Sequence, residues 1–247
     1  MARTLADSIW LRSEPKGRQP SLSRSQIAGA ALAIADAEGF EQVTMRRVAA
    51  RLRAGTMTLY HYVRTKDDLV ALMDDALMAQ VLVPSTELSK GWREAISAIA
   101  RRTRAVLSQH PWSLVSMQLA PPGPRAMEHF EQCLAALADA PLEPTDKLAL
   151  LGCVDDLAFG SALRAGDTKR REHVNRATER AIRKLGEQML ATGRFPHILA
   201  LFEGRSDRQS AALLTSTTDD ERFELGLTAI LDRFDPAVPA RRRTRKR

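Results

Sequence analysis

The stretch from Val43 to Lys66 carries six basic side chains and no acidic one, interleaved with hydroxyl, phenol and imidazole groups. Cations of this kind pair with phosphates, whereas the uncharged polar groups can read the edges of DNA bases. Four aspartates lie directly after this block, within residues 67–75. The net charge of residues 23–83 is therefore zero, and the basic block cannot be recognised from the net charge alone. Its composition indicates a nucleic-acid contact, with a solvated basic face as the alternative.

Patterns that would support catalysis or hold a metal are absent from the sequence. There is no glycine-rich nucleotide fingerprint, no P-loop and no Gly-x-Ser-x-Gly elbow. The two cysteines, Cys133 and Cys153, lie on apolar helix faces, which favours inert thiols over a nucleophile or a sensor. The five histidines, at positions 61, 110, 129, 173 and 197, lack metal-ligand spacing. We therefore expect no enzymatic activity, no metal and no cofactor.

The elements that position the basic block are predicted to be helices. Apolar residues recur at helical spacing within residues 22–40, 43–52, 56–63 and 65–83. Ser23 or Ser25, Thr44 and Thr65 are expected N-caps, and Gly39 is expected to end the first helix. Two short helices joined by a tight turn and braced by a preceding helix form a helix-turn-helix, whose second helix enters the major groove. The alternative is an ordinary helical hairpin with half-buried tyrosines.

The segment VTMRRVAARLRAGTMTLYHYVRTKDDLV resembles the DNA-binding signature of the tetracycline-repressor family. The matching features are Thr-x-Arg at the start of the first helix, Ala-x-x-Leu before the turn, and Thr-Leu-Tyr in the second helix, followed by a basic residue, an N-cap and Lys. The match spans residues 23–83, about a quarter of the chain. The resemblance implies a set of DNA contacts: Thr44 and Arg46 from the first helix, then Thr56, Met57, Thr58, Tyr60, His61 and Tyr62 from the recognition helix, and Lys66 on a phosphate.

One position departs from the family pattern. Arg53 stands in the turn where the family usually has glycine, and Gly55 comes two residues later. A non-glycine residue held in the left-handed region costs about 1–2 kcal/mol. Either the turn shifts slightly, or Arg53 stays in place and reaches a phosphate.

The rest of the chain is predicted to be helical as well, at about residues 90–109, 112–119, 124–138, 145–165, 170–192, 195–203 and 219–235. Its pattern is similar to the C-terminal domain of tetracycline-repressor-type regulators, which implies an inducer-binding core and a dimer interface of two helices per subunit. Apolar stripes on helices 145–165 and 219–235 supply the expected interface residues, with plain intrachain core as the alternative: Leu148, Ala158, Ala162, Phe223, Leu227, Ile230, Leu231 and Phe234.

A ligand cavity should be apolar with a few polar groups. Asp155 is unusual on a largely apolar helix; it could orient a polar ligand atom, although an interhelical or surface hydrogen bond is the favoured interpretation. Residues 168–186 are charge-rich and indicate a solvated helix. A metal chelate bound through His110 or His129 is a less favoured possibility. The expected ligand contacts are Trp112, Met117, Phe130, Cys133, Leu134, Leu137, Leu151, Asp155 and Phe159.

The sequence thus divides into a flexible extension (1–22), a helix-turn-helix domain (23–83), a ligand-binding and dimerisation domain (84–235) and a disordered basic tail (236–247). The tail holds six of the seven units of net positive charge and is expected to add phosphate contacts that do not depend on sequence. Signal-peptide and membrane-span patterns are missing, which favours the cytoplasm.

We expect an all-α, ligand-responsive regulator, most simply a repressor that binds a palindromic operator as a homodimer. A small hydrophobic or amphipathic inducer would release it from DNA. The competing hypothesis is a helical small-molecule-binding protein or an enzyme with an incidental basic face.

Overall fold

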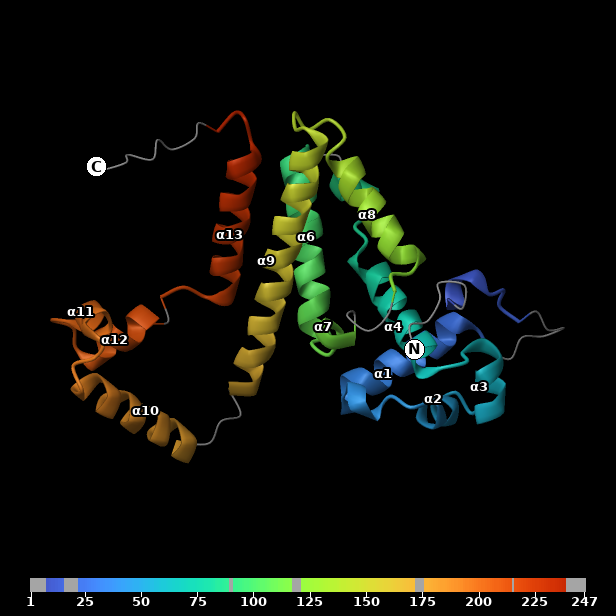
Figure 1. Cartoon of the computed structure of the whole chain (residues 1–247), viewed down its shortest axis with the longest axis horizontal. Helices are drawn as coiled ribbons and strands as arrows, with labels where there is room; N and C mark the ends of the chain where they lie inside the picture. Colours follow the sequence, from blue (N-terminus) through green and yellow to red (C-terminus); the bar gives the residue numbers. More distant parts are fainter. Residues whose placement is uncertain are drawn as a thin grey trace.

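The computed structural model describes residues 8–15, 22–88, 91–116, 121–171, 176–214 and 216–238, and all the regular structure in these ranges is helical (Figure 1). The all-α prediction is confirmed. The α-helices are α1 (Arg24–Glu38), α2 (Met45–Arg51), α3 (Thr56–Tyr62), α4 (Lys66–Val81), α5 (Ser85–Leu88), α6 (Trp92–Gln109), α7 (Ser113–Ser116), α8 (Pro124–Ala136), α9 (Pro144–Arg171), α10 (Arg176–Ala191), α11 (Pro196–Phe202), α12 (Asp207–Leu214) and α13 (Asp219–Phe234); two 3-10 turns are η2 (Ile9–Leu11) and η3 (Phe40–Gln42).

Helices α1–α4, which we call the head, begin where the sequence predicts. The side-chain oxygens of Ser23, Thr44 and Thr65 accept hydrogen bonds from the backbone N–H groups of Gln26, Arg47 and Asp68, at 3.1, 3.3 and 3.1 Å. Each bond satisfies a donor that the first turn of a helix leaves unpaired. Gly39 follows α1 with a φ of 98°, a conformation that glycine adopts without steric cost.

The head encloses its own apolar core. Ile27, Ala31 and Ile34 of α1 are buried with Val48 of α2 and Leu59 of α3. Leu69 and Met73 of α4 complete the same cluster. Because α2 and α3 are only seven residues each, their position depends on this shared core rather than on intrinsic helix stability.

The prediction of a flexible N-terminal extension is wrong for residues 8–15, which are packed against the head. Ile9 is only 2% exposed and belongs to the core of the head. The guanidinium of Arg12 lies 2.6 Å from the buried carboxylate of Asp68. Apolar burial and this ion pair hold the segment, and it is too short to leave a periodic signal in the sequence. Residues 1–7 and 16–21 lie outside the described part of the chain.

Helices α6, α8, α9 and α13 form a second core, which we call the bundle, and α4 reaches from the head to pack against α8 and α6 (Figure 1). Val154 and Ala158 of α9 are buried with Phe223, Leu227 and Leu231 of α13. Helix α9 continues through Gly166, where the sequence predicted an end, and α5 and α12 were not predicted. Glycine weakens a helix but does not by itself end it.

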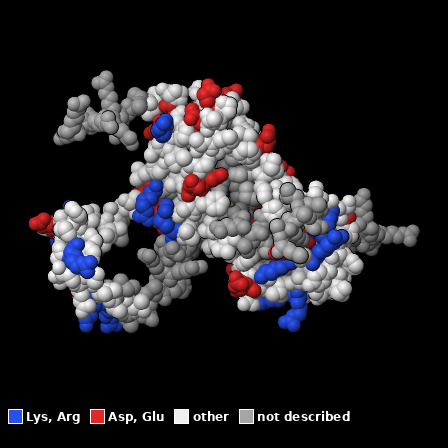
Figure 2. Space-filling model, viewed as in Figure 1, with Lys and Arg blue, Asp and Glu red and all other residues white. Residues whose placement is uncertain are grey.

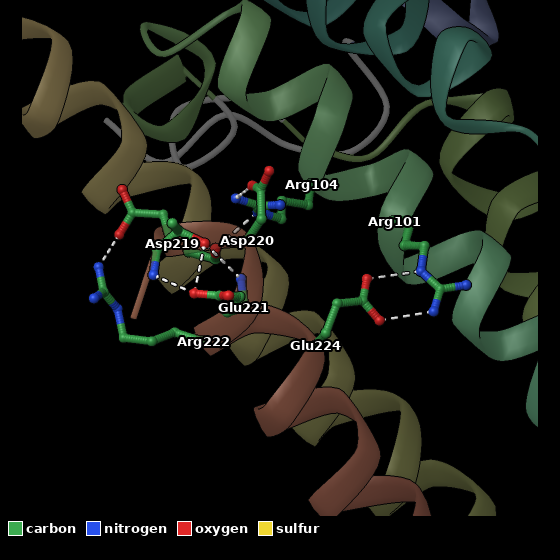
Figure 3. Close-up of polar contacts among 9 residues, drawn as sticks. Arg101, Arg104, Asp219, Asp220, Glu221, Arg222 and Glu224 are labelled. Atoms are coloured by element: carbon green, nitrogen blue, oxygen red, sulfur yellow. Dashed lines mark hydrogen bonds and ion pairs between the residues drawn. The ribbon is translucent and has the colours of Figure 1, made fainter. Parts of the chain in front are cut away.

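Charged side chains join α13 to α6 at the edge of the bundle (Figure 3). Arg101 binds both carboxylate oxygens of Glu224, at 2.8 and 2.7 Å. Arg104 binds Asp220 at 2.6 Å and Ser161 at 2.8 Å, and its guanidinium lies 4.8 Å from the Phe223 ring centroid. A reciprocal capping box between Thr218 and Glu221 fixes the start of α13.

Helices α10–α12, which we call the arm, leave the end of α9 and swing away from the bundle before the chain returns as α13 (Figure 1). The exposure expected for the charge-rich segment holds for the described side chains of α10. Apolar side chains are exposed on all three helices as well, namely Leu185, Met189, Ile198, Leu199, Leu201 and Leu214. The arm therefore leaves apolar surface that the chain does not cover by itself.

Candidate DNA interface and effector core

Helix α3 presents one face to the core of the head and the other to solvent. Leu59 and Val63 are fully buried and mark the inward face of the helix, and the exposed side chains lie on the opposite side. Met57 is 74% exposed and Tyr60 is 42% exposed, beside the exposed ring of His61. Thr56 and Thr58 are half-exposed at the start of the same helix. These five predicted contact residues share an outward surface that a duplex can reach.

Tyr62 does not belong to that surface. Its side chain is 7% exposed and lies in the core of the head, so the prediction of an exposed Tyr62 is wrong. The reason is helical spacing: Tyr62 follows Leu59 by three residues and therefore lies on the same inward face. A tyrosine can bury its ring and still keep its hydroxyl near the surface, which is the most that Tyr62 can offer to DNA.

Helix α2 carries two neighbouring arginines, of which only one is bound to other side chains of the head. Arg46 is exposed and has no ion pair within the described residues. Its neighbour Arg47 instead binds the carboxylate of Glu38 and the amide oxygen of Gln42, the latter at 2.7 Å. Thr44 is exposed, and its hydroxyl oxygen is already the N-cap of the helix. Of these residues, Arg46 has the charge that an anionic partner can use.

Lys66 stands exposed at the first position of α4, with its ammonium nitrogen 5.6 Å from the centroid of the Phe40 ring. The ring orients the ammonium group without neutralising it, because a cation–π contact leaves the N–H donors available. Lys and Arg side chains gather over the head at the right of Figure 2. The predicted phosphate contact therefore lies beside the helix-turn-helix.

The turn between α2 and α3 keeps the register that the family pattern requires. Arg53 has a φ of 53°, and it is the one non-glycine residue with positive φ in the described ranges. The Arg53 N–H donates to the Ala50 carbonyl at 3.1 Å, and the Ala54 N–H donates to the Ala49 carbonyl at 2.9 Å. These two bonds define a Schellman motif with arginine at the position where glycine is strongly preferred.

Trp112 packs against the core of the head and not within the bundle core, and its contact with a ligand stays a prediction. Its ring stacks on Phe40 at 5.8 Å between centroids, and its indole N–H donates to Asp36 at 2.8 Å. His110 Nδ1 lies 2.6 Å from the same carboxylate oxygen. The loop after α6 is therefore bound to the head. Local sequence cannot show whether a short loop between two domains packs against one domain or the other. Met117 lies outside the described residues.

Four of the predicted ligand contacts do meet inside the bundle. Cys133, Leu137 and Leu151 are buried, and Leu134 packs against them. Phe130 is exposed and Phe159 only half-buried, so neither ring belongs to the closed interior, and their contact with a ligand stays a prediction. Both lie on outward faces of amphipathic helices, where apolar spacing alone does not reveal whether a second molecule covers them.

His129, which the sequence suggests only as a less favoured partner of a metal chelate, lies next to Cys133. His129 is buried one turn earlier on α8, with Nε2 3.7 Å from the Cys133 sulfur and Nδ1 buried without a hydrogen-bond partner in the described part of the chain. Burial lowers the pKa of His129 and raises the pKa of Cys133 to about 12, with a smaller contribution to the latter from Asp155. Both groups are therefore uncharged near neutral pH.

Asp155 lies at the exposed side of α9 and makes no hydrogen bond or ion pair within the described residues. Partial desolvation by the surrounding chain, and then the neighbouring Asp156, raise its pKa to about 6. Its charge also acts on the thiol of Cys133, so Asp155 is exposed to solvent and yet close to one of the buried predicted ligand contacts.

The predicted dimer stripes are largely intrachain core. Ala158 and Ala162 of α9 and Phe223, Leu227 and Leu231 of α13 are buried within one chain, and Ile230 and Phe234 pack against the same cluster. For the five buried side chains the alternative of intrachain core holds, whereas Ile230 and Phe234 are partly exposed and their place in an interface stays a prediction. Leu148 remains exposed, and the other large apolar side chains exposed on these helices are Leu163 and Leu225.

The described residues form neither a membrane span nor a metal site. No described helix combines the length and apolar character of a membrane span. No described group of three or more histidine, cysteine, aspartate or glutamate side chains is arranged to hold a metal ion. A surface groove of about 400 Å³ between α5, α6 and α13 is lined by Arg93 and Arg101, whose charges are already paired with carboxylates of α13.

Comparison with known proteins agrees with this arrangement. Residues 27–73 match the family model described as bacterial regulatory proteins of the tetR family, and residues 84–234 match that of the tetracyclin repressor-like C-terminal domain. The HTH-type transcriptional repressor DrrR1 of Streptomyces coeruleorubidus is 35% identical over 98% of this chain and 88% of its own length. The tetracycline repressor protein class E of Escherichia coli is 28% identical over 62% of this chain and 72% of its own length.

Solved structures share the fold. ActR from Streptomyces coelicolor without ligand superposes with a TM-score of 0.67 and 26% identity, covering 88% of this chain and 96% of its own. ActR in complex with actinorhodin gives 0.68 and 27%, covering 86% and 95%. The family match spans both the helix-turn-helix and the bundle, and the chain therefore belongs to the tetracycline-repressor family of bacterial transcriptional regulators.

Proposed function

We propose that two copies of this chain bind a palindromic operator, one head in each of two major-groove half-sites, and repress transcription until a small molecule binds the bundle. The observation that carries the proposal is the outward face of α3, with Met57, Tyr60 and His61 exposed beside the free cation of Arg46. A short recognition helix reads few bases, so pairing two heads supplies the affinity that one lacks.

Within each head the contacts divide by chemistry. Arg46 and the outward residues Thr56, Met57, Thr58, Tyr60 and His61 meet the duplex from α2 and α3, while Lys66 binds a phosphate from the start of α4. Thr44 contacts DNA mainly through its position at the first turn, since its hydroxyl caps α2. This division assigns residues 23–83 to DNA and residues 84–235 to the ligand and the second copy.

A homodimer is supported by the apolar surface that one chain leaves open. Leu148 and Leu163 of α9 and Leu225 of α13 are exposed on helices whose other faces build the bundle core. Apolar side chains on the arm add to this surface. Two copies related by a two-fold axis would cover α9 and α13 with the same helices of the partner, which makes a four-helix contact.

Ligand control is supported by the interior of the bundle and by ActR, whose structure is solved with actinorhodin. A small hydrophobic or amphipathic molecule would bind among Cys133, Leu134, Leu137 and Leu151. The joint at Asp36, which accepts bonds from His110 and Trp112, links the end of α6 to the head. The ligand releases DNA only if it binds the operator-competent spacing of the heads more weakly than the alternative spacing.

The test is selection of bound sequences from random DNA with purified protein, followed by affinity measurements on the enriched palindrome. Arg46→Ala should weaken binding by about 1–3 kcal/mol, and Tyr60→Ala should weaken it as well. Arg47→Ala is the matched control, because Arg47 is occupied by Glu38 and Gln42. Absence of an enriched palindrome at several salt concentrations, or equal affinity for Arg46→Ala and the unaltered protein, would overturn the proposal in favour of an enzyme or a simple binding protein.

We also propose a cellular location for the protein and a role for its C-terminal tail. It assigns the protein a non-enzymatic role in the cytoplasm, where a bacterial operator lies. The basic tail, of which residues 239–247 lie outside the described ranges, adds contacts to phosphates beyond the operator. Deleting residues 236–247 should flatten the salt dependence of DNA binding and leave the preferred sequence unchanged.

A further inference from the structure

Arg53 occupies a backbone conformation that arginine rarely adopts. Its φ of 53° is imposed by the Schellman bonds from Arg53 to Ala50 and from Ala54 to Ala49. Ala54 packs against the core of the head, so the turn cannot relax without disturbing that core. A residue with a Cβ is strained at this point, whereas glycine is not.

The neighbouring glycine does not relieve the strain. Gly55 has an ordinary φ of −71° as the N-cap of α3, and a Cβ placed on it would meet only the Thr58 hydroxyl oxygen, at 3.6 Å. The turn therefore carries a glycine where another residue would fit and an arginine where glycine would be best. Local backbone strain of this sort is characteristic of positions that serve a function.

The Arg53 side chain has no role in holding the head together. It is exposed and makes no ion pair or hydrogen bond within the described residues. By contrast, Arg12 and Arg47 are bound to carboxylates of the same domain. Arg53 therefore resembles Arg46, Arg51 and Arg64, which are also exposed and without ion pairs in the described part of the head.

We infer that Arg53 contacts a phosphate of the DNA backbone from the turn that precedes the recognition helix. The inference rests on the proposed DNA-binding function and adds a contact to it. A guanidinium presents paired N–H donors that fit phosphate oxygens, and a backbone contact of this kind fixes the depth and angle of α3 without reading sequence. Because the turn is held by two hydrogen bonds, the arginine is presented from a rigid base.

The experiment compares Arg53→Gly, Arg53→Asn and Arg53→Lys in the full chain. Binding to a mixed-sequence DNA duplex is measured across a range of salt concentrations, and thermal unfolding is measured without DNA. Arg53→Gly should bind about tenfold more weakly, with the slope of log affinity against log salt reduced by about 0.9 for each bound head. The same variant should unfold about 1–4 °C higher, because glycine relieves the strained turn.

The other variants separate charge from backbone freedom. Asparagine tolerates the left-handed region but carries no charge, so Arg53→Asn should lose affinity and salt slope as the glycine variant does. Arg53→Lys should keep the salt slope and lose part of the affinity. Arg208→Gln, which removes one positive charge from the distant arm, is the control for net charge and should leave the slope unchanged.

Each result decides the inference. If Arg53→Gly loses affinity and Arg53→Asn does not, the loss comes from a loosened turn and the phosphate contact is wrong. If all three variants keep the salt slope of the unaltered protein, Arg53 does not meet DNA. If the unaltered protein binds no duplex, the proposed function fails together with this contact, whereas binding by the unaltered protein with insensitive variants overturns the Arg53 inference alone.

Discussion

The head and the bundle differ in how completely each covers its own apolar surface. In the described part of the head, the large apolar side chains left exposed are Met57 and Tyr60, both on the face assigned to DNA. In the C-terminal half the exposed ones spread along α7, α8, α9, α13 and the arm. The head thus covers its own apolar surface except on one face, whereas a single chain leaves much of the apolar surface of the C-terminal half exposed.

The largest effect is expected from a charge placed on the exposed surface of α13. Leu225 is 66% exposed in the single chain, so Leu225→Asp should leave the fold intact. In a two-fold contact the substitution acts on both copies at once and buries two carboxylates. We expect monomers in analytical ultracentrifugation and an operator affinity at least about a hundredfold lower, since the two heads no longer act together.

Two further variants serve as controls for Leu225→Asp. Leu11→Asp makes the same change at an exposed leucine of the N-terminal segment and should leave the dimer unaffected. Leu227→Ala alters a side chain that is 1% exposed on the opposite face of α13, and it should lower the free energy of unfolding by about 2–5 kcal/mol. A dimeric Leu225→Asp protein would mean that the open face of α13 is not the interface.

The same contrast explains what could be predicted from sequence. In the head the signals are local: Thr44 and Thr65 cap helices, Gly39 ends one, and a single apolar face on each helix leads inward. Helix α9 is apolar on two faces, with Val154 inside and Leu163 outside. Periodicity identifies such a helix but cannot tell which face meets its own chain, so residues of the intrachain core were predicted for the interface.

Long-range contacts escape sequence reasoning for a related reason. The stacking of Trp112 on Phe40 and the burial of Ile9 join segments that are far apart in the chain. No spacing rule links such positions, because the chain path between them is set by the tertiary fold. The strained turn at Arg53 was foreseeable, since the Schellman geometry follows from local hydrogen bonds that the family pattern implies.

A second prediction tests whether the N-terminal segment belongs to the closed head. Arg12→Ala would remove the guanidinium that lies 2.6 Å from the buried Asp68 carboxylate, although the Arg64 backbone N–H still donates to it at 3.0 Å and Arg24 interacts with it electrostatically. Removing one partner of a buried ion pair is costly, and we expect a loss of about 2–4 kcal/mol in urea unfolding. Arg64→Ala, which removes an exposed cation at the same end of α4, should change stability by less than about 0.5 kcal/mol. Equal effects would show that Arg12 contributes no more than a surface charge.

The third prediction concerns Asp74, on the part of α4 that leaves the head for the C-terminal half. Burial raises the pKa of Asp74 from 3.8 to about 6, although a hydrogen bond from Ser116 at 2.7 Å opposes the shift. Because the folded pKa is the higher one, the folded state binds the proton more tightly. Its contribution to stability is therefore present below about pH 4 and is lost as pH rises through about 6.

Asp74→Asn removes this pH dependence while keeping an oxygen that can accept the Ser116 hydrogen bond. The variant should be more stable than the unaltered protein by about 1–3 kcal/mol near pH 7 and equally stable near pH 4. Urea unfolding at the two pH values measures the difference. A variant that is less stable near pH 7 would mean that the carboxylate is ionised and favourably solvated in the folded protein.

The smallest effect is expected at the ion pair that looks strongest. Arg101 and Glu224 form a two-bond contact at 2.8 and 2.7 Å, which raises the pKa of Arg101 and lowers that of Glu224. Their side chains are nevertheless 56% and 44% exposed, so water already solvates both charges well. Arg101→Ala should therefore lower stability by less than about 1 kcal/mol, and the loss should shrink as salt is raised. A loss as large as that of Arg12→Ala would mean that α13 is held to α6 by charge rather than by the burial of Phe223, Leu227 and Leu231. The helices of the bundle would then not be held mainly by apolar contacts, which is the arrangement that a second copy and a ligand can change.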